Sequence, residues 1–197
     1  MFTGLYQSIA TLMIVVAFYA MDFVLIVRND RRRQAPGSGR SWSYTLMMLT
    51  AVALVVAQPA LLPELSLRTD AWWGGLIQAI GIGLIAAGLA LHGWARAHLR
   101  QYYAERVELQ AGHRVVDTGP YAYVRHPVFT SFFWCAGGLL LVNPAVVTLL
   151  VAVYTCWDFR RAAQQEEALL GGSLPGYVDY AKRTSRFFPS LKHMCKR

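Results

Sequence analysis

The chain has 197 residues, of which 55% are hydrophobic and 15% are charged, and its formal net charge is +8. Its apolar residues occur in blocks that are too long for the core of a soluble domain, so the composition excludes an ordinary soluble protein and predicts an all-α integral membrane protein. We expect a single membrane domain over residues 1–197, with three spans in 1–95 and the polar and remaining helical segments in 96–197.

Three segments in the first half of the chain have the length of a membrane span: residues 5–27, 43–62 and 72–95. About 20 residues, each rising ~1.5 Å along a helix, cross the ~30 Å of hydrocarbon in a bilayer. The third segment contains Gly81, Gly83 and Gly88, and we expect these glycines to let the helix pack closely against a neighbour.

Two shorter apolar segments follow at 128–142 and 145–158, and the turn-forming pair Asn143-Pro144 separates them. We interpret them as a helical hairpin, which gives about five transmembrane helices in all. The alternative is one kinked span, since proline is tolerated in membrane helices. However, residues 128–158 are longer than a single crossing needs.

The basic residues predict the orientation of the chain. Of the 19 lysines and arginines, all except Arg68 lie in the first loop, the third loop or the tail after residue 158. If the hairpin returns the chain to the side that it left, these segments share one side, which the positive-inside rule assigns to the cytoplasm. The N-terminus is then outside, the C-terminus is cytoplasmic, and the membrane is the inner membrane if the source is bacterial. A single span instead of a hairpin would place the basic tail outside, so five spans fit better.

The positive charge and the cysteines exclude two further classes. We attribute the net charge to topology and to anionic lipid headgroups, and we expect no nucleic-acid partner. The three cysteines are odd in number and two of them lie in expected helices, so we predict neither a disulfide framework nor a metal site.

The first polar segment follows the third span. We expect residues 95–109 to continue that helix into the cytoplasm, with Arg96, Arg100 and Glu105 on its wetted surface. The turn residues Thr118-Gly119-Pro120 then precede the hairpin.

The second polar segment follows the hairpin. We expect a helix over 159–170 that ends at Gly171-Gly172, and a second amphipathic segment that begins at Pro175.

A short hairpin brings its two flanking segments together. Arg125 and His126 at its entry would then lie close to Arg160, Glu166 and Glu167 beyond its exit. A cationic group that faces two carboxylates suits a zwitterionic ligand, whose carboxylate binds the arginine and whose ammonium binds a glutamate. The alternative is that Arg125 anchors a helix at the lipid headgroups and that the two glutamates form an ordinary solvated helix face.

The order of several motifs resembles a known family. The motifs are GPYAYVRHP at 119–127, Asn143-Pro144, EEALL at 166–170, YVDY at 177–180 and RFFP at 186–189. Together they resemble the isoprenylcysteine carboxyl methyltransferase family over roughly residues 80–190, and related phospholipid methyltransferases share parts of the pattern. The resemblance implies methyl transfer from S-adenosylmethionine at the membrane surface. It implies a lipophilic small-molecule or lipidated acceptor, in the first place a carboxylate such as that of an isoprenylcysteine, with a lipid amine or thiol as the alternative.

The resemblance also implies the residues of the site. The candidates for the cofactor are His113, Tyr121, Arg125, His126, Pro127 and Glu167. The candidates beside the reacting groups, as catalytic residues, are Glu166 and Arg160. The sequence departs from the family pattern at Phe129 and Ser131, where tyrosine and glycine are common, and at Leu99-Arg100, where Leu-Gly is common.

Two other classes of protein remain open. An enzyme of the sterol-reductase type would use NADPH and resembles the C-terminal part of this family, but this chain is short for the many spans of such enzymes. The other class is a membrane protein that is not an enzyme.

Overall fold

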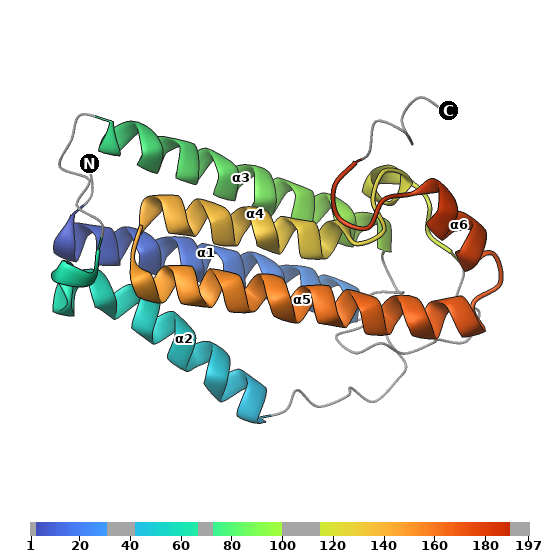
Figure 1. Cartoon of the computed structure of the whole chain (residues 1–197), viewed down its shortest axis with the longest axis horizontal. Coiled ribbons are helices and arrows are strands. Elements are labelled where there is room, and N and C mark those ends of the chain that lie inside the picture. The colour runs from blue at the N-terminus through green and yellow to red at the C-terminus, as the bar shows by residue number, and fades with distance from the viewer. Residues whose placement is uncertain (1–2, 31–41, 67–72, 100–114, 190–197) are drawn as a thin grey trace.

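The computed structural model describes residues 3–30, 42–66, 73–99 and 115–189. Within these ranges the chain forms helices joined by loops (Figure 1). The described residues contain two isolated β-bridges and no β-sheet. In chain order the helices are α1 (Gly4–Asp30), α2 (Trp42–Leu61), η1 (Pro63–Leu65), α3 (Gly74–Leu99), η3 (Gly119–Ala122), α4 (Pro127–Val142), α5 (Val146–Ser173) and α6 (Tyr177–Arg183). The expectation of an all-helical chain is therefore correct for the described residues.

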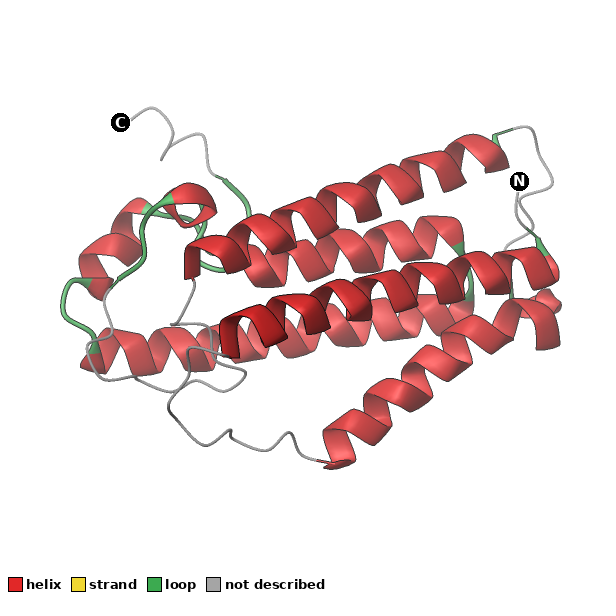
Figure 2. Ribbon diagram, turned by 180° about the vertical axis from the view of Figure 1, so that it is seen from behind, coloured by secondary structure: helices red, strands yellow, loops and turns green. Residues whose placement is uncertain are grey.

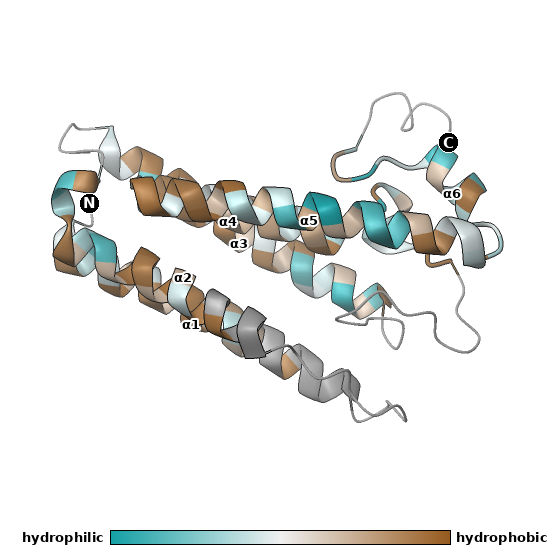
Figure 3. Cartoon of the chain, turned by 60° about the horizontal axis from the view of Figure 1, so that its bottom comes forward, coloured by the Kyte–Doolittle hydropathy of each residue, from teal (hydrophilic) through white to brown (hydrophobic). Residues whose placement is uncertain are grey.

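Two of these helices are long and apolar enough to cross a membrane, namely α3 and the segment Gly4–Met21 of α1. Leu49–Leu61 of α2 and all of α4 are apolar but shorter. Large apolar side chains such as Met13, Leu54 and Leu150 are more than half exposed on the outside of the helices, which a hydrocarbon surrounding explains better than water does. Figure 3 shows apolar residues over the length of the bundle and hydrophilic residues on the second half of α5 and on α6.

Helix α3 packs very closely against α4 because glycines line their contact. A Cβ atom at Gly81 would lie 2.7 Å from the carbonyl oxygen of Gly138, and one at Gly88 would lie 2.7 Å from Cys135 Sγ. The packing role expected for Gly81 and Gly88 is confirmed. The same expectation is wrong for Gly83, because a Cβ atom there would meet nothing within 4 Å.

The predicted hairpin is present. Helices α4 and α5 are separate and lie side by side in opposite directions, so the alternative of one kinked span is excluded (Figures 1 and 2). The buried Asn143 fastens the turn between them, since its Nδ2 atom donates a hydrogen bond to the carbonyl oxygen of Val55 on α2 at 3.1 Å.

The expected helix end at Gly171-Gly172 is wrong, because α5 continues to Ser173. Leu174 N still donates to the carbonyl oxygen of Leu170 at 2.8 Å, and the buried Leu174 packs with Tyr177 and Tyr180 of α6. These contacts stabilise the last turn of α5. The reversal comes at Gly176, whose φ of 81° lies in the left-handed region that favours glycine. Helix α6 begins at the next residue, two residues after Pro175.

The position of Arg96 differs from the one that the sequence predicted. Arg96 is only 1% exposed, so the expectation that it lies on a wetted surface is wrong. The α3 face that carries Arg96 also carries the buried His92, and the two side chains are hydrogen-bonded within the bundle. Arg100 and Glu105, expected on the same surface, lie outside the described residues.

Candidate functional site

Three cationic side chains converge on one carboxylate where α4 begins. Arg125 Nε lies 2.9 Å from Glu167 Oε1, and His126 Nε2 lies 3.1 Å from the same oxygen. Arg186 contacts both oxygens, with Nη2 at 2.6 Å from Oε2 and Nε at 3.0 Å from Oε1. Glu166 joins on the outer side, since its Oε2 lies 3.4 Å from His126 Nδ1. We call these five residues the charge cluster.

The C-terminal strap, residues 184–187, holds the charge cluster against the start of α4. The backbone N–H groups of Arg125 and His126 donate to the carbonyl oxygens of strap residues Ser185 and Arg186 at 2.8 and 3.1 Å. Arg125 Nη1 also donates to the carbonyl oxygens of Ala181 and Thr184. The guanidinium of Arg125 is therefore occupied by Glu167 and by this part of the backbone.

The loop before α4 is fixed by a close approach of its backbone to α3. Gly119 has a φ of 59°, and a Cβ atom there would lie 2.5 Å from the ring of His98, so glycine is required on both counts. Gly119 and Pro120 open η3, and Tyr121 follows, with a side chain that is 6% exposed. The carbonyl oxygen of Tyr121 accepts a hydrogen bond from Tyr180 Oη at 2.8 Å, which ties this loop to α6.

The contacts in the charge cluster perturb its ionisable groups. Burial opposes the ionisation of Glu167, but hydrogen bonds from His126, Arg186 and Arg125 hold its pKa well below the usual range. Burial would lower the pKa of His126, yet its hydrogen bonds with Glu166 and Glu167 raise the pKa above the usual value. Glu167 is thus an anion at neutral pH, and both ring nitrogens of His126 face carboxylates.

The members of the charge cluster differ in exposure, which decides what each can contact. The side chains of Arg125 and Glu167 are 12% and 15% exposed. Those of Arg186 and Glu166 are 35% and 34% exposed. Arg186 and Glu166, the outer pair, are therefore accessible to a ligand. The inner pair, Arg125 and Glu167, is largely engaged in contacts within the protein.

An aromatic column leads from the charge cluster into the bundle. The ring of His126 stacks on Phe129 with centroids 5.3 Å apart, and a cation over an aromatic face is favourable. Phe129 stacks on Phe159 at 5.1 Å, and Phe159 stacks on Phe132 at 4.6 Å. These rings form an apolar wall between the first turns of α4 and the middle of α5.

The structure brings together most of the residues predicted from the sequence. Arg125, His126, Glu166 and Glu167 lie in the charge cluster itself. Pro127 is the first residue of α4, where its missing N–H costs nothing. Tyr121 contributes its backbone carbonyl oxygen, which accepts the hydrogen bond from Tyr180 Oη. His113 lies outside the described residues.

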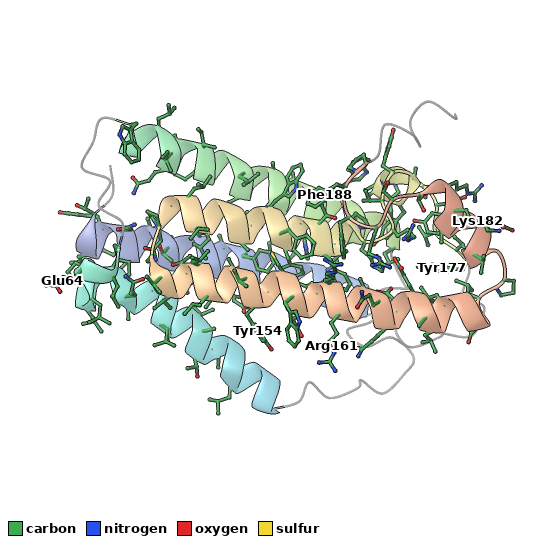
Figure 4. All side chains as sticks on the ribbon, viewed as in Figure 1. Glu64, Tyr154, Arg161, Tyr177, Lys182 and Phe188 are labelled. Atoms are coloured by element: carbon green, nitrogen blue, oxygen red, sulfur yellow. The ribbon has the colours of Figure 1, made fainter. Side chains whose placement is uncertain are left out.

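Arg160 lies apart from the charge cluster. It is exposed on α5, seven residues or about 10 Å before Glu167 along the helix axis. Its neighbour Arg161 lies over the ring of Trp157, with Cζ 5.7 Å from the centroid, and Figure 4 shows Arg161 on the outer side of α5.

Sequence reasoning missed Arg186 and the strap that carries it. The motif RFFP at 186–189 was recognised, but no pattern in the sequence predicted that its arginine reaches Glu167. The contact depends on the backbone hydrogen bonds that hold the strap against Arg125 and His126, and these join distant parts of the chain.

Comparisons with known proteins agree with these motifs. Residues 80–171 match the family described as the isoprenylcysteine carboxyl methyltransferase (ICMT) family. The chain is 26% identical over 160 residues to the protein-S-isoprenylcysteine O-methyltransferase of Saccharomyces cerevisiae, covering 76% of this chain and 64% of the relative. It is 28% identical over 184 residues to that of Mus musculus, covering 89% and 62%. It is also 26% identical over 141 residues to the nickel-cobalt-cadmium resistance protein NccN of Alcaligenes xylosoxydans xylosoxydans, covering 71% and 62%.

A solved structure shares the fold. The eukaryotic intramembrane Ras methyltransferase ICMT matches with a TM-score of 0.69 and 21% identity over 93% of this chain and 66% of that one. The chain thus spans a little under two thirds of the length of these proteins. The two proteins share a helical fold, and in the solved protein that fold is intramembrane.

Proposed function

We propose, from the premise that the chain belongs to the isoprenylcysteine carboxyl methyltransferase family, that it transfers a methyl group from S-adenosylmethionine to a lipophilic acceptor at the membrane surface. The match to the family model and the similarity to the yeast relative confirm the family that the motifs predicted. The relatives named as methyltransferases favour an enzyme that uses a methyl donor over a reductase or a protein without activity. The observation that carries the proposal is the charge cluster, in which a partly exposed carboxylate and a partly exposed guanidinium flank a largely buried ionic network.

The charge cluster suits the amino-acid end of S-adenosylmethionine, which carries an ammonium and a carboxylate. Glu166 would accept the ammonium, because a third of its side chain is exposed and His126 is its nearest contact in the charge cluster. Arg186 would bind the carboxylate with the exposed part of its guanidinium. Arg125, His126 and Glu167 would hold these two side chains in place. This assignment moves both ligand contacts outward from Arg125 and Glu167, the pair favoured on sequence alone.

The chemistry asks little more of the protein. The bound cofactor supplies a sulfonium methyl group, and the transfer breaks the S–CH₃ bond as the acceptor forms its own bond to the methyl carbon. A carboxylate acceptor, with a pKa near ~4, needs no base at neutral pH. The charge of the acceptor and the sulfonium charge neutralise each other, so exclusion of water favours the reaction. The rings of Phe129, Phe132 and Phe159 would keep water out.

The acceptor would approach from the membrane side of the charge cluster. Arg160 is exposed on α5, between Glu166 and the apolar half of that helix. It is a cation that could bind an acceptor carboxylate such as that of an isoprenylcysteine. A lipid amine or thiol is the alternative acceptor, and its proton would then pass to a base. The sequence predicts Glu166 for that role, which would leave the cofactor ammonium to another group.

The topology belongs to the same proposal. The chain would form one membrane domain with five spans, an outside N-terminus and a cytoplasmic C-terminus, in the inner membrane if the source is bacterial. The hairpin supports this arrangement because it returns the chain to the end of the bundle where α3 ends, so that the strap, α6 and the second half of α5 share one side (Figure 1). Membrane lipids are the expected surroundings.

Calorimetric titration of the purified protein in detergent tests the cofactor. S-adenosylmethionine should bind, NADPH should not, and Arg186→Ala and Glu166→Gln should each weaken binding by roughly 1.5–3 kcal/mol. Transfer of labelled methyl to lipophilic carboxylates, amines and thiols then identifies the acceptor class. Binding of NADPH without S-adenosylmethionine would replace the proposal by a reductase.

A carboxylate acceptor should also give a rate that is nearly flat from about pH 6 to 9, because no proton leaves it. A rate that climbs with pH, and that stops climbing in Glu166→Gln, would assign an amine or thiol acceptor.

A further inference from the structure

A second set of buried polar side chains lies deeper in the bundle. His92 and Arg96, one turn apart on α3, and Ser131 on α4 are each at most 1% exposed. Burial of such groups between membrane helices has a large desolvation cost, and polar groups at these positions are commonly functional. The methyl transfer proposed above uses none of the three.

The hydrogen bonds of this set define where each proton lies. Ser131 Oγ donates to the carbonyl oxygen of Val128 at 2.5 Å, so it can only accept in its 3.1 Å contact with His92 Nδ1. His92 is therefore protonated at Nδ1. Arg96 Nε is always a donor, and it lies 3.3 Å from His92 Nε2, which must accept. Donation thus runs in one direction, from Arg96 through His92 and Ser131 to Val128, and we call this chain the relay.

Packing holds the imidazole of the relay in its orientation. The ring of Phe18 on α1 lies 5.5 Å from that of His92, and the ring of Phe132 on α4 lies 5.4 Å away in an edge-to-face arrangement. His92 is thus the point at which α1, α3 and α4 meet around one polar side chain. Phe132 also ends the aromatic column that begins at His126.

The relay ends on the first turn of α4, which directly follows Arg125 and His126 of the charge cluster. Val128 is the second residue of α4, and Arg125 and His126 immediately precede that helix. The same turn is held from the other side, because Thr130 Oγ1 donates to the carbonyl oxygen of Phe187 in the strap at 2.7 Å. The first turn of α4 is therefore fixed between α3 and the strap.

We propose that His92 is a positioning residue for the methyl-transfer site, which links the buried Arg96 to Ser131 and so sets the first turn of α4 and with it Arg125 and His126. This inference rests on the proposed function. Its magnitude is set by geometry, since a misplacement of about 1 Å at reacting groups costs about 10²-fold in rate. Ser131 stands where the resemblance to the family would place glycine, so the hydroxyl that accepts the hydrogen bond from His92 is a feature of this chain.

The kinetic test compares two substitutions of His92. His92→Phe keeps an aromatic ring between its neighbours and loses both hydrogen bonds, and it should lower kcat/KM by about 10- to 100-fold, mainly through kcat. His92→Asn retains an amide that can donate to Ser131 and should recover most of the loss. Ser131→Ala should give a loss similar to that of His92→Phe, and the double variant should be little worse than either, because both residues act in one chain.

Gln78→Leu is the matched control. Gln78 is also buried on α3 and also donates to α4, but its partner is the carbonyl oxygen of Val142 at the opposite end of that helix. Its loss should lower stability and leave kcat unchanged. If Gln78→Leu and His92→Phe lower kcat equally, or if His92→Asn recovers nothing, His92 has a general structural role and the proposal is wrong.

A readout that needs no methyl transfer is the ¹⁵N NMR spectrum of histidine-labelled protein in detergent micelles. His92 should give the spectrum of an imidazole protonated at Nδ1, and the His126 resonances should shift in His92→Phe and in Ser131→Ala but not in Gln78→Leu. A proton on Nε2 of His92, or a His126 spectrum unchanged in both relay variants, overturns the relay. If the parent neither binds S-adenosylmethionine nor transfers methyl, the proposed function fails, and the His126 spectrum still decides whether the relay positions the charge cluster.

Discussion

Replacement of Glu167 by glutamine removes the negative charge on which Arg125, His126 and Arg186 converge. A hydrogen bond to a charged group contributes about 1.5–3 kcal/mol, and loss of one partner of a buried pair costs about 3–5 kcal/mol. Two features reduce this cost, because Arg186 is 35% exposed and the amide oxygen of glutamine still accepts hydrogen bonds. We therefore expect the free energy of unfolding to fall by about 3 kcal/mol at neutral pH.

The pH dependence of this loss distinguishes the contribution of Glu167 to the free energy of unfolding from that of His126. The folded pKa of Glu167 is lowered, so its stabilisation is complete above the unfolded value of about 4.3 and disappears as the pH falls through the folded pKa. The folded pKa of His126 is raised, so its stabilisation is complete below about 6.5 and disappears as the pH rises through the folded pKa. The difference between the parent and Glu167→Gln should thus be largest between about pH 5 and 6.5.

The assay is denaturant unfolding in mixed micelles at several pH values, with Glu166→Gln as the control. Glu166 is the adjacent residue on the same helix, but it is 34% exposed and reaches only His126 in the charge cluster, so its loss should cost less than about 1 kcal/mol. In cofactor titration the order should reverse, so that Glu166→Gln loses more affinity than Glu167→Gln although it loses less stability. Equal destabilisation by both changes, or a Glu167→Gln variant as stable as the parent at pH 6, would refute the division of the charge cluster into an inner and an outer pair.

Three further predictions follow from the fold and the site. Gly138→Ala should destabilise by about 1–3 kcal/mol in the same unfolding assay, because its Cβ atom would lie 2.6 Å from the backbone oxygen of Gly81, whereas Gly83→Ala should be neutral. A reporter that is active only in the cytoplasm should work when it is fused after Arg197, and activity of a reporter that needs export would refute five spans. Arg160→Ala should raise KM or lower kcat for an anionic acceptor in methyl-transfer kinetics and leave the calorimetric affinity for S-adenosylmethionine unchanged, so a loss of that affinity would contradict its placement outside the charge cluster.

The helices and their connections could be predicted from the sequence because they depend on local properties. Apolar length predicted α1, α2 and α3 to within a few residues, and Asn143-Pro144 marked the turn between α4 and α5. The sequence also predicted that the hairpin would bring His126 close to the glutamate pair, since a short hairpin returns to its starting side. These are consequences of chain length and turn chemistry, which neighbouring residues specify.

The tertiary structure alone decided which of two adjacent glutamates is the inner one. Glu166 and Glu167 differ by about 100° around α5, and which of them faces inward depends on where the strap lies. The strap brings Arg186 to Glu167 from 19 residues away through backbone contacts with Arg125 and His126 that no local pattern encodes. Arg96 is the second case, because an arginine near a helix end is ordinarily in contact with water, whereas here it is buried within the bundle beside His92. In both cases the outcome depends on which surface meets another segment, and packing between distant parts of the chain sets that choice.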